Sequence, residues 1–165
     1  MKKNGSSKSK TDIGTFEIAL KRAAGLCSRQ EQCTSHIREK LRSWNVNGED
    51  EEKIIRKLTE EKFLDDERFA GFYVKDKFKL NGWGRIRISH MLRQKGVDEE
   101  FIGNALLQIE EEEWFQTCLG LIQSKFSKLK EEDPFKQKGK LLRYAASRGF
   151  EPALIYRALD ELERK

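Results

Sequence analysis

Apolar residues along this chain recur at intervals of three and four positions, which is the spacing of an amphipathic helix. Residues 64–74 illustrate the pattern, because Phe69, Phe72 and Tyr73 fall at helical spacing on one face. Asp65 or Asp66, where that stretch begins, can cap a helix by accepting hydrogen bonds from its first N–H groups. No sustained two-residue alternation is present, so the pattern predicts an all-α fold.

The helical pattern repeats along the chain. The segment IREKLRSWNV at residues 37–46 is similar to ISHMLRQKGV at residues 88–97, and LLRYAASRGF at residues 141–150 is similar to both. The apolar residues that follow the second and third segments keep identical spacings: Ile102 and Leu106, then Ile155 and Leu159. This agreement predicts an internal repeat that occurs three times.

Each repeat is predicted to hold three helices. The first helices are expected at residues 15–29, 65–80 and 113–129. The second helices are expected at residues 34–44, 83–95 and 134–148. The third helices are expected at residues 50–62, 98–111 and 151–163. Gly96 and Gly149 fit the position just past a helix end, where the backbone turns left-handed.

These elements define the expected domain organisation. We predict a disordered basic tail at residues 1–14, followed by three-helix repeats at residues 15–64, 65–112 and 113–165. Units of this kind each bury one face against the next, so we expect an elongated, curved array.

The composition agrees with a helical protein. Of the 165 residues, 37% are charged and 37% are apolar, and only two are proline. No apolar run approaches the roughly 20 residues of a membrane span, and no apolar segment follows Lys2 and Lys3 as in a secretory signal. Cys27, Cys33 and Cys118 are scattered, as reduced thiols are. We therefore expect a cytoplasmic protein.

The search for catalytic residues is negative. His36 and His90 have no histidine or cysteine at the spacing of a metal site, and no phosphate-binding glycine loop is present. Cys27 and Cys33 lie six positions apart, with no base to activate either of them. We expect no enzymatic activity, no metal and no cofactor.

The charge is more informative in its distribution than in its total. The net charge is +5, but residues 1–14 hold four lysines against Asp12, which leaves only +2 for the rest. Basic residues concentrate on and before the predicted second helices. In repeat order they are Arg38 and Arg42; Lys75, Lys77, Lys79, Arg85, Arg87, Arg93 and Lys95; then Lys136, Lys138, Lys140, Arg143 and Arg148. Such stripes suit phosphates or an acidic protein face, and solvated helix faces explain them equally well.

Three strings, in this order and spacing, resemble the RecX regulatory family of bacteria. They are LDDERFAGFYV at residues 64–74, GWGRIRISHMLRQKGV at residues 82–97 and RGFEPALIYRAL at residues 148–159. The resemblance covers residues 15–163. The motif residues are Leu64, Asp65, Asp66, Arg68, Phe69, Ala70, Tyr73, Gly96, Gly149 and Phe150, to which we assign a structural role. One departure is Trp44-Asn45-Val46, where the family has Lys-Gly and an apolar residue.

The resemblance implies a function. RecX proteins are non-enzymatic tandem repeats that bind the RecA filament and suppress its ATPase, strand-exchange and co-protease activities, and some members also touch DNA. We accordingly expect a monomeric inhibitor of RecA in DNA repair and recombination, with the basic stripes as its contact surface. A stand-alone helical DNA-binding protein is the alternative, and single- or double-stranded DNA is the partner that it predicts.

Overall fold

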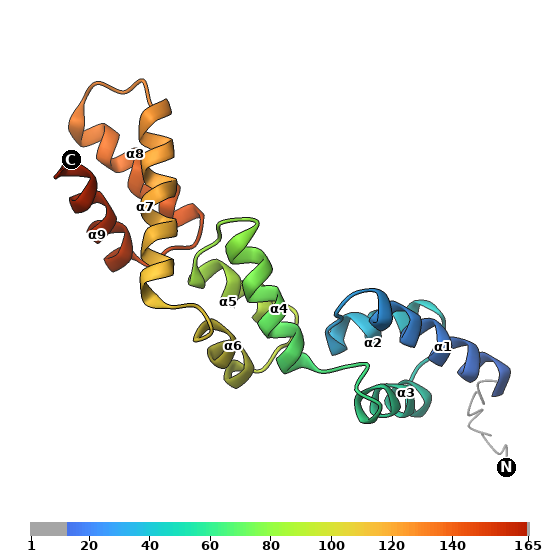
Figure 1. Ribbon diagram of the computed structural model, residues 1–165. Coiled ribbons are helices and arrows are strands. Elements are labelled where there is room, and N and C mark those ends of the chain that lie inside the picture. The colour runs from blue at the N-terminus through green and yellow to red at the C-terminus, as the bar shows by residue number, and fades with distance from the viewer. Residues whose placement is uncertain (1–12, 165) are drawn as a thin grey trace, which may run out of the picture. The chain divides into compact units, whose positions relative to one another are not determined.

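The computed structural model describes residues 13–164 of the chain, and the regular structure of this part is entirely α-helical (Figure 1). The first three helices are α1 (Ile13–Arg29), α2 (Thr34–Ser43) and α3 (Glu49–Glu60). The next three are α4 (Asp66–Lys79), α5 (Arg85–Gln94) and α6 (Glu99–Leu106). The last three are α7 (Glu111–Lys128), α8 (Pro134–Ser147) and α9 (Pro152–Glu163). Over residues 13–164 no helix is both long and apolar enough to cross a bilayer.

The predicted all-α fold is confirmed, and every helix end except that of α6 lies within two residues of its predicted position. Helix α1 begins at Ile13, inside the predicted tail, while residues 1–12 of that tail lie outside the described residues. Helix α6 ends at Leu106 and not at residue 111. It stops early because Ile109 is buried in the core and Glu110 caps α7, forming a capping box with Glu113.

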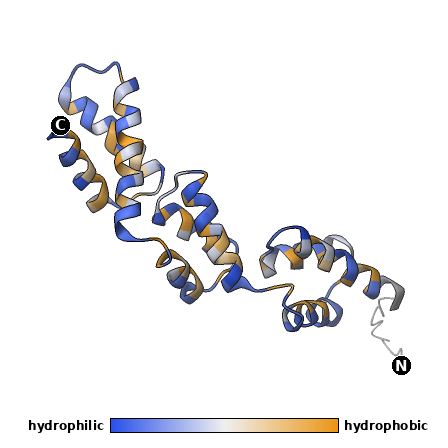
Figure 2. Cartoon of the chain, viewed as in Figure 1, coloured by the Kyte–Doolittle hydropathy of each residue, from blue (hydrophilic) through white to orange (hydrophobic). Residues whose placement is uncertain are grey.

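The chain divides into two compact units, residues 1–65 (unit 1) and residues 66–165 (unit 2). We refer to α1–α3 as repeat 1, α4–α6 as repeat 2 and α7–α9 as repeat 3. Unit 1 thus contains repeat 1, and unit 2 contains repeats 2 and 3. In both units the helices turn apolar residues toward one another and polar residues outward (Figure 2).

Unit 1 has its own small core. Ile37 and Leu41 of α2 and Ile54 and Leu58 of α3 are fully buried, and Ala23 of α1 packs against them. These positions are the apolar stripe that the sequence pattern predicted. Removal of this apolar surface from water is what holds the three helices together.

One continuous core runs through repeats 2 and 3 of unit 2. Its centre is an aromatic pair between repeats: Phe78 of α4 meets Trp114 of α7 edge to face, with 4.5 Å between the ring centroids. Trp114 is completely buried. Aromatic pairs in this geometry stabilise a core beyond their buried area, so the two repeats form a single structural unit.

The backbones of repeats 2 and 3 also touch directly, at Gly84 and Gly149. The N–H of Gly84 donates to the carbonyl oxygen of Arg148 at 2.8 Å, and the N–H of Ile86 donates to that of Gly149 at 3.0 Å. A Cβ atom on Gly84 would lie 2.3 Å from the Gly149 oxygen, and one on Gly149 would lie 2.3 Å from Arg87 Cβ. Both positions therefore require glycine, and we call this contact the glycine junction.

The backbone at the ends of the second helices is left-handed, as predicted. Gly96 has φ +73° and Gly149 has φ +93°. Asn45 occupies the matching position of repeat 1 with φ +61°. Asparagine tolerates this conformation better than most residues with a side chain, which explains the departure from the family pattern.

The glycine junction leads to a stability prediction. We expect Gly149→Ala to lower the free energy of unfolding of unit 2 by about 2–4 kcal/mol, because the new Cβ overlaps Arg87 and the positive φ strains alanine. Urea denaturation followed by circular dichroism measures the change.

Gly120→Ala is the matched control within the same unit. Gly120 is an exposed residue of α7, and a Cβ there would meet no atom within 4 Å. This substitution should raise stability by about 0.5–1 kcal/mol, because it removes a flexible residue from a helix. Equal effects of the two substitutions would show that the junction does not constrain the fold.

Candidate partner-binding surface

The predicted basic residues fall into two kinds, according to the group that each contacts in the structure. Some lie within hydrogen-bonding distance of a carboxylate, which neutralises their charge. Others extend into solvent or lie over an aromatic ring, which attracts a cation without neutralising it. Only the second kind offers its charge to a binding partner at little cost, since the first must break an existing pair.

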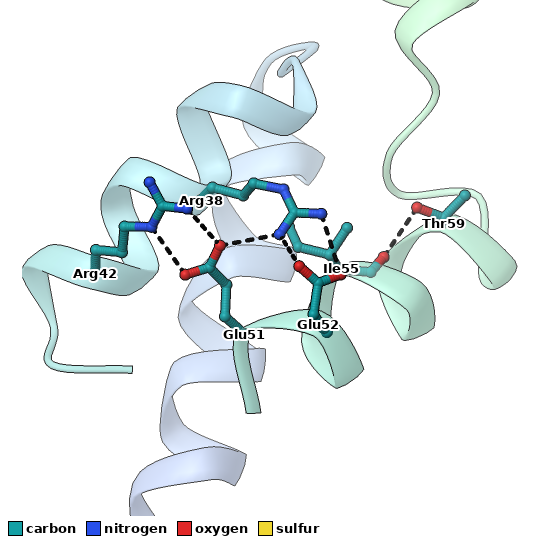
Figure 3. Close-up of polar contacts among 6 residues, drawn as sticks. All are labelled: Arg38, Arg42, Glu51, Glu52, Ile55 and Thr59. Carbon is teal, nitrogen blue, oxygen red and sulfur yellow. Dashed lines mark hydrogen bonds and ion pairs between the residues drawn. The ribbon is translucent and has the colours of Figure 1, made fainter. Parts of the chain in front are cut away.

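Arg38 and Arg42 of repeat 1 belong to the first kind (Figure 3). Both extend from α2 toward Glu51 at the start of α3: Arg42 Nε lies 2.9 Å from one carboxylate oxygen, and Arg38 Nη1 lies 2.9 Å from the other. Arg38 also pairs with Glu52. Only 4% of Glu51 is exposed. The hydrogen bonds from Arg42 and Arg38 lower the pKa of Glu51, although burial opposes the shift.

Repeat 2 contains the same clamp. Arg93 of α5 aligns with Arg42 and pairs with Glu99 in the first turn of α6. Hydrogen bonding from Arg93 lowers the pKa of Glu99. The clamp thus joins the second helix to the third in both repeats. Sequence reasoning assigned Arg38, Arg42 and Arg93 to a partner without noticing these acids.

Arg85 is held between repeats 2 and 3. Its guanidinium pairs with Glu111, and its Nη1 lies 3.1 Å from a carboxylate oxygen of Glu151. The same group lies over the Trp114 ring, 4.8 Å from its centroid. Reversing the charge of Arg85 would therefore disturb the contact between the repeats, so such a variant cannot report on partner binding alone.

Two lysines of α8 are also neutralised. Lys138 Nζ lies 2.9 Å from Glu163 at the end of α9, and Lys140 Nζ lies 2.8 Å from Glu131 before α8. Hydrogen bonding to Lys140 lowers the pKa of Glu131. These pairs hold α8 against its neighbours.

Four predicted residues extend into solvent. Lys75 and Lys79 lie one turn apart on α4, and Lys136 and Arg143 lie two turns apart on α8. All four are exposed, and none has an ion-pair partner within residues 13–164. They present positive charge to any acidic partner that reaches these helices.

Three of the four remaining basic residues surround two aromatic rings of repeat 2. Lys77 Nζ lies 5.3 Å from the ring centroid of Tyr73 and 5.2 Å from that of Trp83. Arg87 lies over Trp83 at 4.0 Å, and Lys95 lies over Tyr73 at 5.8 Å. A ring attracts a cation without neutralising it. We call these five residues the cation–ring cluster.

Arg148 completes the set. Its guanidinium donates to the backbone oxygen of Asn81, ahead of the glycine junction, while its buried Nε has no hydrogen-bond partner among the described residues. It therefore anchors the α8–α9 turn to the α4–α5 turn. Neither Arg148 nor Arg87 pairs with a carboxylate in the described part of the chain.

Most of the motif residues lie in the core, at the start of α4 or in turns. Leu64, Ala70 and Phe150 are almost completely buried, and the Phe69 ring packs 5.7 Å from that of Tyr73. Helix α4 begins at Asp66. Asp65 directly precedes that helix, and Arg68 is half-buried on it. Gly96 and Gly149 lie in left-handed turns. Tyr73 differs because it contacts two cations as well.

Sequence reasoning missed the groups that hold the basic residues. An acid three positions before the buried isoleucine of the third helix was the available signal for the clamps: Glu51 before Ile54, and Glu99 before Ile102. The cation–ring cluster had no comparable signal, since Tyr73 and Trp83 lie on either side of a turn.

Over residues 13–164 no three His, Cys, Asp or Glu side chains are grouped so that they could hold a metal ion. Burial raises the pKa of the Cys118 thiol to about 12, so this cysteine stays protonated near neutral pH.

Comparison with known proteins identifies the family. The profile of the RecX second three-helix domain matches residues 65–106, and that of the third matches residues 111–159. A regulatory protein RecX from Prosthecochloris aestuarii (strain DSM 271 / SK 413) is 31% identical over 144 residues, which cover 87% of this chain and 93% of that protein. The chain belongs to the RecX family.

Other RecX proteins extend the comparison. The regulatory protein RecX of Clostridium botulinum (strain Eklund 17B / Type B) is 37% identical over 127 residues, or 74% of this chain, but the chain spans only 58% of that relative. The crystal structure of RecX from Lactobacillus salivarius matches with a TM-score of 0.85 at 20% identity, over 92% of this chain and 99% of that one. The predicted RecX resemblance and helical-repeat fold are thus confirmed.

The clamp of repeat 1 yields a stability prediction for this RecX protein. We expect Glu51→Gln to lower the free energy of unfolding by about 1–3 kcal/mol, because a buried charged acceptor of two arginines is lost. Urea denaturation measures the total, and hydrogen exchange of the α2 and α3 amides locates it in unit 1. Glu52→Gln is the control and should change stability far less, because that side chain is exposed.

The same clamp should depend on pH. Because the folded-state pKa of Glu51 is lowered from 4.5, its stabilisation is complete above that value and is lost as the pH falls through the folded-state pKa. The difference between the wild-type protein and the Glu51→Gln variant should therefore shrink in acid. A difference that is independent of pH would contradict the assignment.

Proposed function

We propose that this RecX-family protein binds the filament of the RecA recombinase and lowers its ATPase, strand-exchange and co-protease activities. It would thereby modulate DNA repair and recombination in the cytoplasm, without catalysis of its own. The relatives reported above are named regulatory proteins, which supports a regulatory role.

The uncompensated cations of unit 2 are the observation that carries the proposal. Lys75, Lys79, Lys136 and Arg143 have no ion pair in the described chain, whereas the predicted cations of repeat 1 are neutralised by Glu51 and Glu52. Exposed cations of this kind favour an acidic partner through electrostatic complementarity, which sets specificity and the rate of association. Repeat 1 also exposes Lys53 and Lys57, but these lysines share α3 with the four acids of its first turn. We therefore propose repeats 2 and 3 as the principal contact surface.

Helix-turn-helix binding to DNA is less well supported than filament binding. In that motif the first turn of the last helix enters the major groove, close to the phosphates. Here the first turn of α3 holds four acids, from Glu49 to Glu52, and that of α6 holds Glu99 and Glu100. Arginines neutralise Glu51, Glu52 and Glu99, but among the described residues Glu49, Asp50 and Glu100 have no ion pair. The negative charge of these three acids opposes such docking in repeats 1 and 2.

Addition of the protein to RecA filaments tests the proposal directly. Stoichiometric amounts should lower the rate of ATP hydrolysis by RecA assembled on single-stranded DNA, because the proposed regulator acts on the filament that hydrolyses ATP. An unchanged rate would exclude this function. Tight, salt-sensitive DNA binding in the absence of RecA would instead support the DNA-binding alternative.

A charge-reversal pair tests the surface itself. We expect Lys75→Glu with Lys79→Glu to weaken inhibition of the RecA ATPase about tenfold, since two uncompensated cations become repulsive toward an acidic partner. The midpoint of inhibition against protein concentration measures the loss.

The matched control is Lys53→Glu with Lys57→Glu on α3. These lysines are also exposed and one turn apart, and they have no ion pair in the described residues. This control should inhibit as the wild-type protein does. Equal losses in the two variants would point to a general effect of net charge and would remove α4 from the contact surface.

A further inference from the structure

We propose that the cation–ring cluster of repeat 2 is a preorganised receptor for an acidic protein segment with closely spaced carboxylates. The cluster consists of Lys77, Arg87 and Lys95 with Tyr73 and Trp83. That the segment belongs to the RecA filament rests on the proposed function. Binding of an acidic segment as such does not depend on it.

The first argument is the continuity of the cluster. Lys95, Tyr73, Lys77, Trp83 and Arg87 form an unbroken series in which every cation lies over at least one ring, at 4.0 to 5.8 Å from its centroid. The series joins α4 to α5 across their connecting turn. Three positive charges are thereby gathered in one place.

The second argument is that rings, unlike carboxylates, leave the charge of a cation available. Within the described chain Lys77 and Arg87 have no carboxylate partner. Arg157 of α9 provides the contrast, because it lies 3.7 Å from the Phe115 ring centroid but also pairs with Glu112 at 3.3 Å. Like charges held together repel one another, and a bound anion relieves that repulsion.

The third argument is that repeat 3 fixes this surface in place. Arg87 Nη1 lies 3.5 Å from the backbone oxygen of Ser147, and Arg148 donates to the backbone oxygen of Asn81. Trp83 directly precedes Gly84 of the glycine junction. Side chains ordered before binding lose less entropy on binding, which makes an oriented guanidinium an effective carboxylate receptor.

The ring faces distinguish a protein partner from a nucleic acid. Single strands bind to proteins largely by stacking bases on exposed aromatic faces. Here Trp83 is already covered by Arg87 and Lys77, and Tyr73 by Lys77 and Lys95. Bases would have to displace these cations, whereas carboxylates bind to the cations where they lie. The geometry therefore favours an acidic peptide.

A capped oligoglutamate peptide is the probe for this receptor, compared with an oligothymidylate of equal net charge. Titration of the wild-type protein with the peptide should shift the indole N–H resonance of Trp83 in an NMR spectrum. The affinity should fall as salt is added, because screening weakens the attraction. An oligothymidylate that binds more tightly than the peptide would overturn the proposal, as would the absence of a Trp83 shift.

Lys77→Gln with Arg87→Gln tests the cations. We expect this variant to bind the peptide about tenfold more weakly, while Arg157→Gln, the ring-held but neutralised control, stays within about twofold of the wild-type protein. Trp83→Leu keeps every charge but removes the ring that positions two of them, so it should also weaken binding, with helicity unchanged by circular dichroism. Equal losses in the Arg157→Gln control would contradict the proposal.

RecA ATPase assays on the same variants separate the receptor from the proposed function. Loss of both peptide binding and inhibition in Lys77→Gln with Arg87→Gln would support the receptor as a filament contact. Lost peptide binding with full inhibition would overturn that assignment and leave the RecA function intact. A wild-type protein that binds the peptide but does not inhibit RecA would refute the proposed function and not the receptor.

Discussion

The close approach of two backbones at Gly84 and Gly149 is the constraint on which unit 2 depends. A side chain on Gly84 would overlap the backbone of Gly149, and one on Gly149 would overlap Arg87. Without one, the N–H groups of Gly84 and Ile86 reach carbonyl oxygens of the α8–α9 turn. The contact brings repeats 2 and 3 close enough for Phe78 and Trp114 to pack edge to face in one core. Backbone hydrogen bonds and aromatic packing therefore support each other.

The proposed binding surface follows from how each cation is held. Carboxylates such as Glu51 and Glu99 fix arginines and cancel their charge, so these arginines join one helix to the next. Rings such as Trp83 fix cations without cancelling their charge, so those cations remain able to attract an acidic partner. A count of basic residues in the sequence does not separate the two roles. Only the identity of the neighbouring group does.

The repeats share a plan but differ in detail. The clamp between second and third helices occurs in repeats 1 and 2, but Ala146 and Pro152 occupy the corresponding positions of repeat 3. The left-handed turn uses Asn45 in repeat 1 and glycine in the others. Repeat 3 is joined to its neighbour by the glycine junction and by Arg85 instead. Within repeat 3 a different pair, Lys138 with Glu163, joins the second helix to the third.

The sequence by itself determined the helices, the repeat and the family, because these depend on local spacing: the apolar stripe that includes Ile37 and Leu41, and the left-handed turn at Gly149. Tertiary structure decided which basic residues pair with a carboxylate and which do not. Arg85 pairs with Glu151, 66 positions away, and Arg87 lies beside Ser147. Such partners meet only when the chain folds, so no pattern of nearby residues could reveal them.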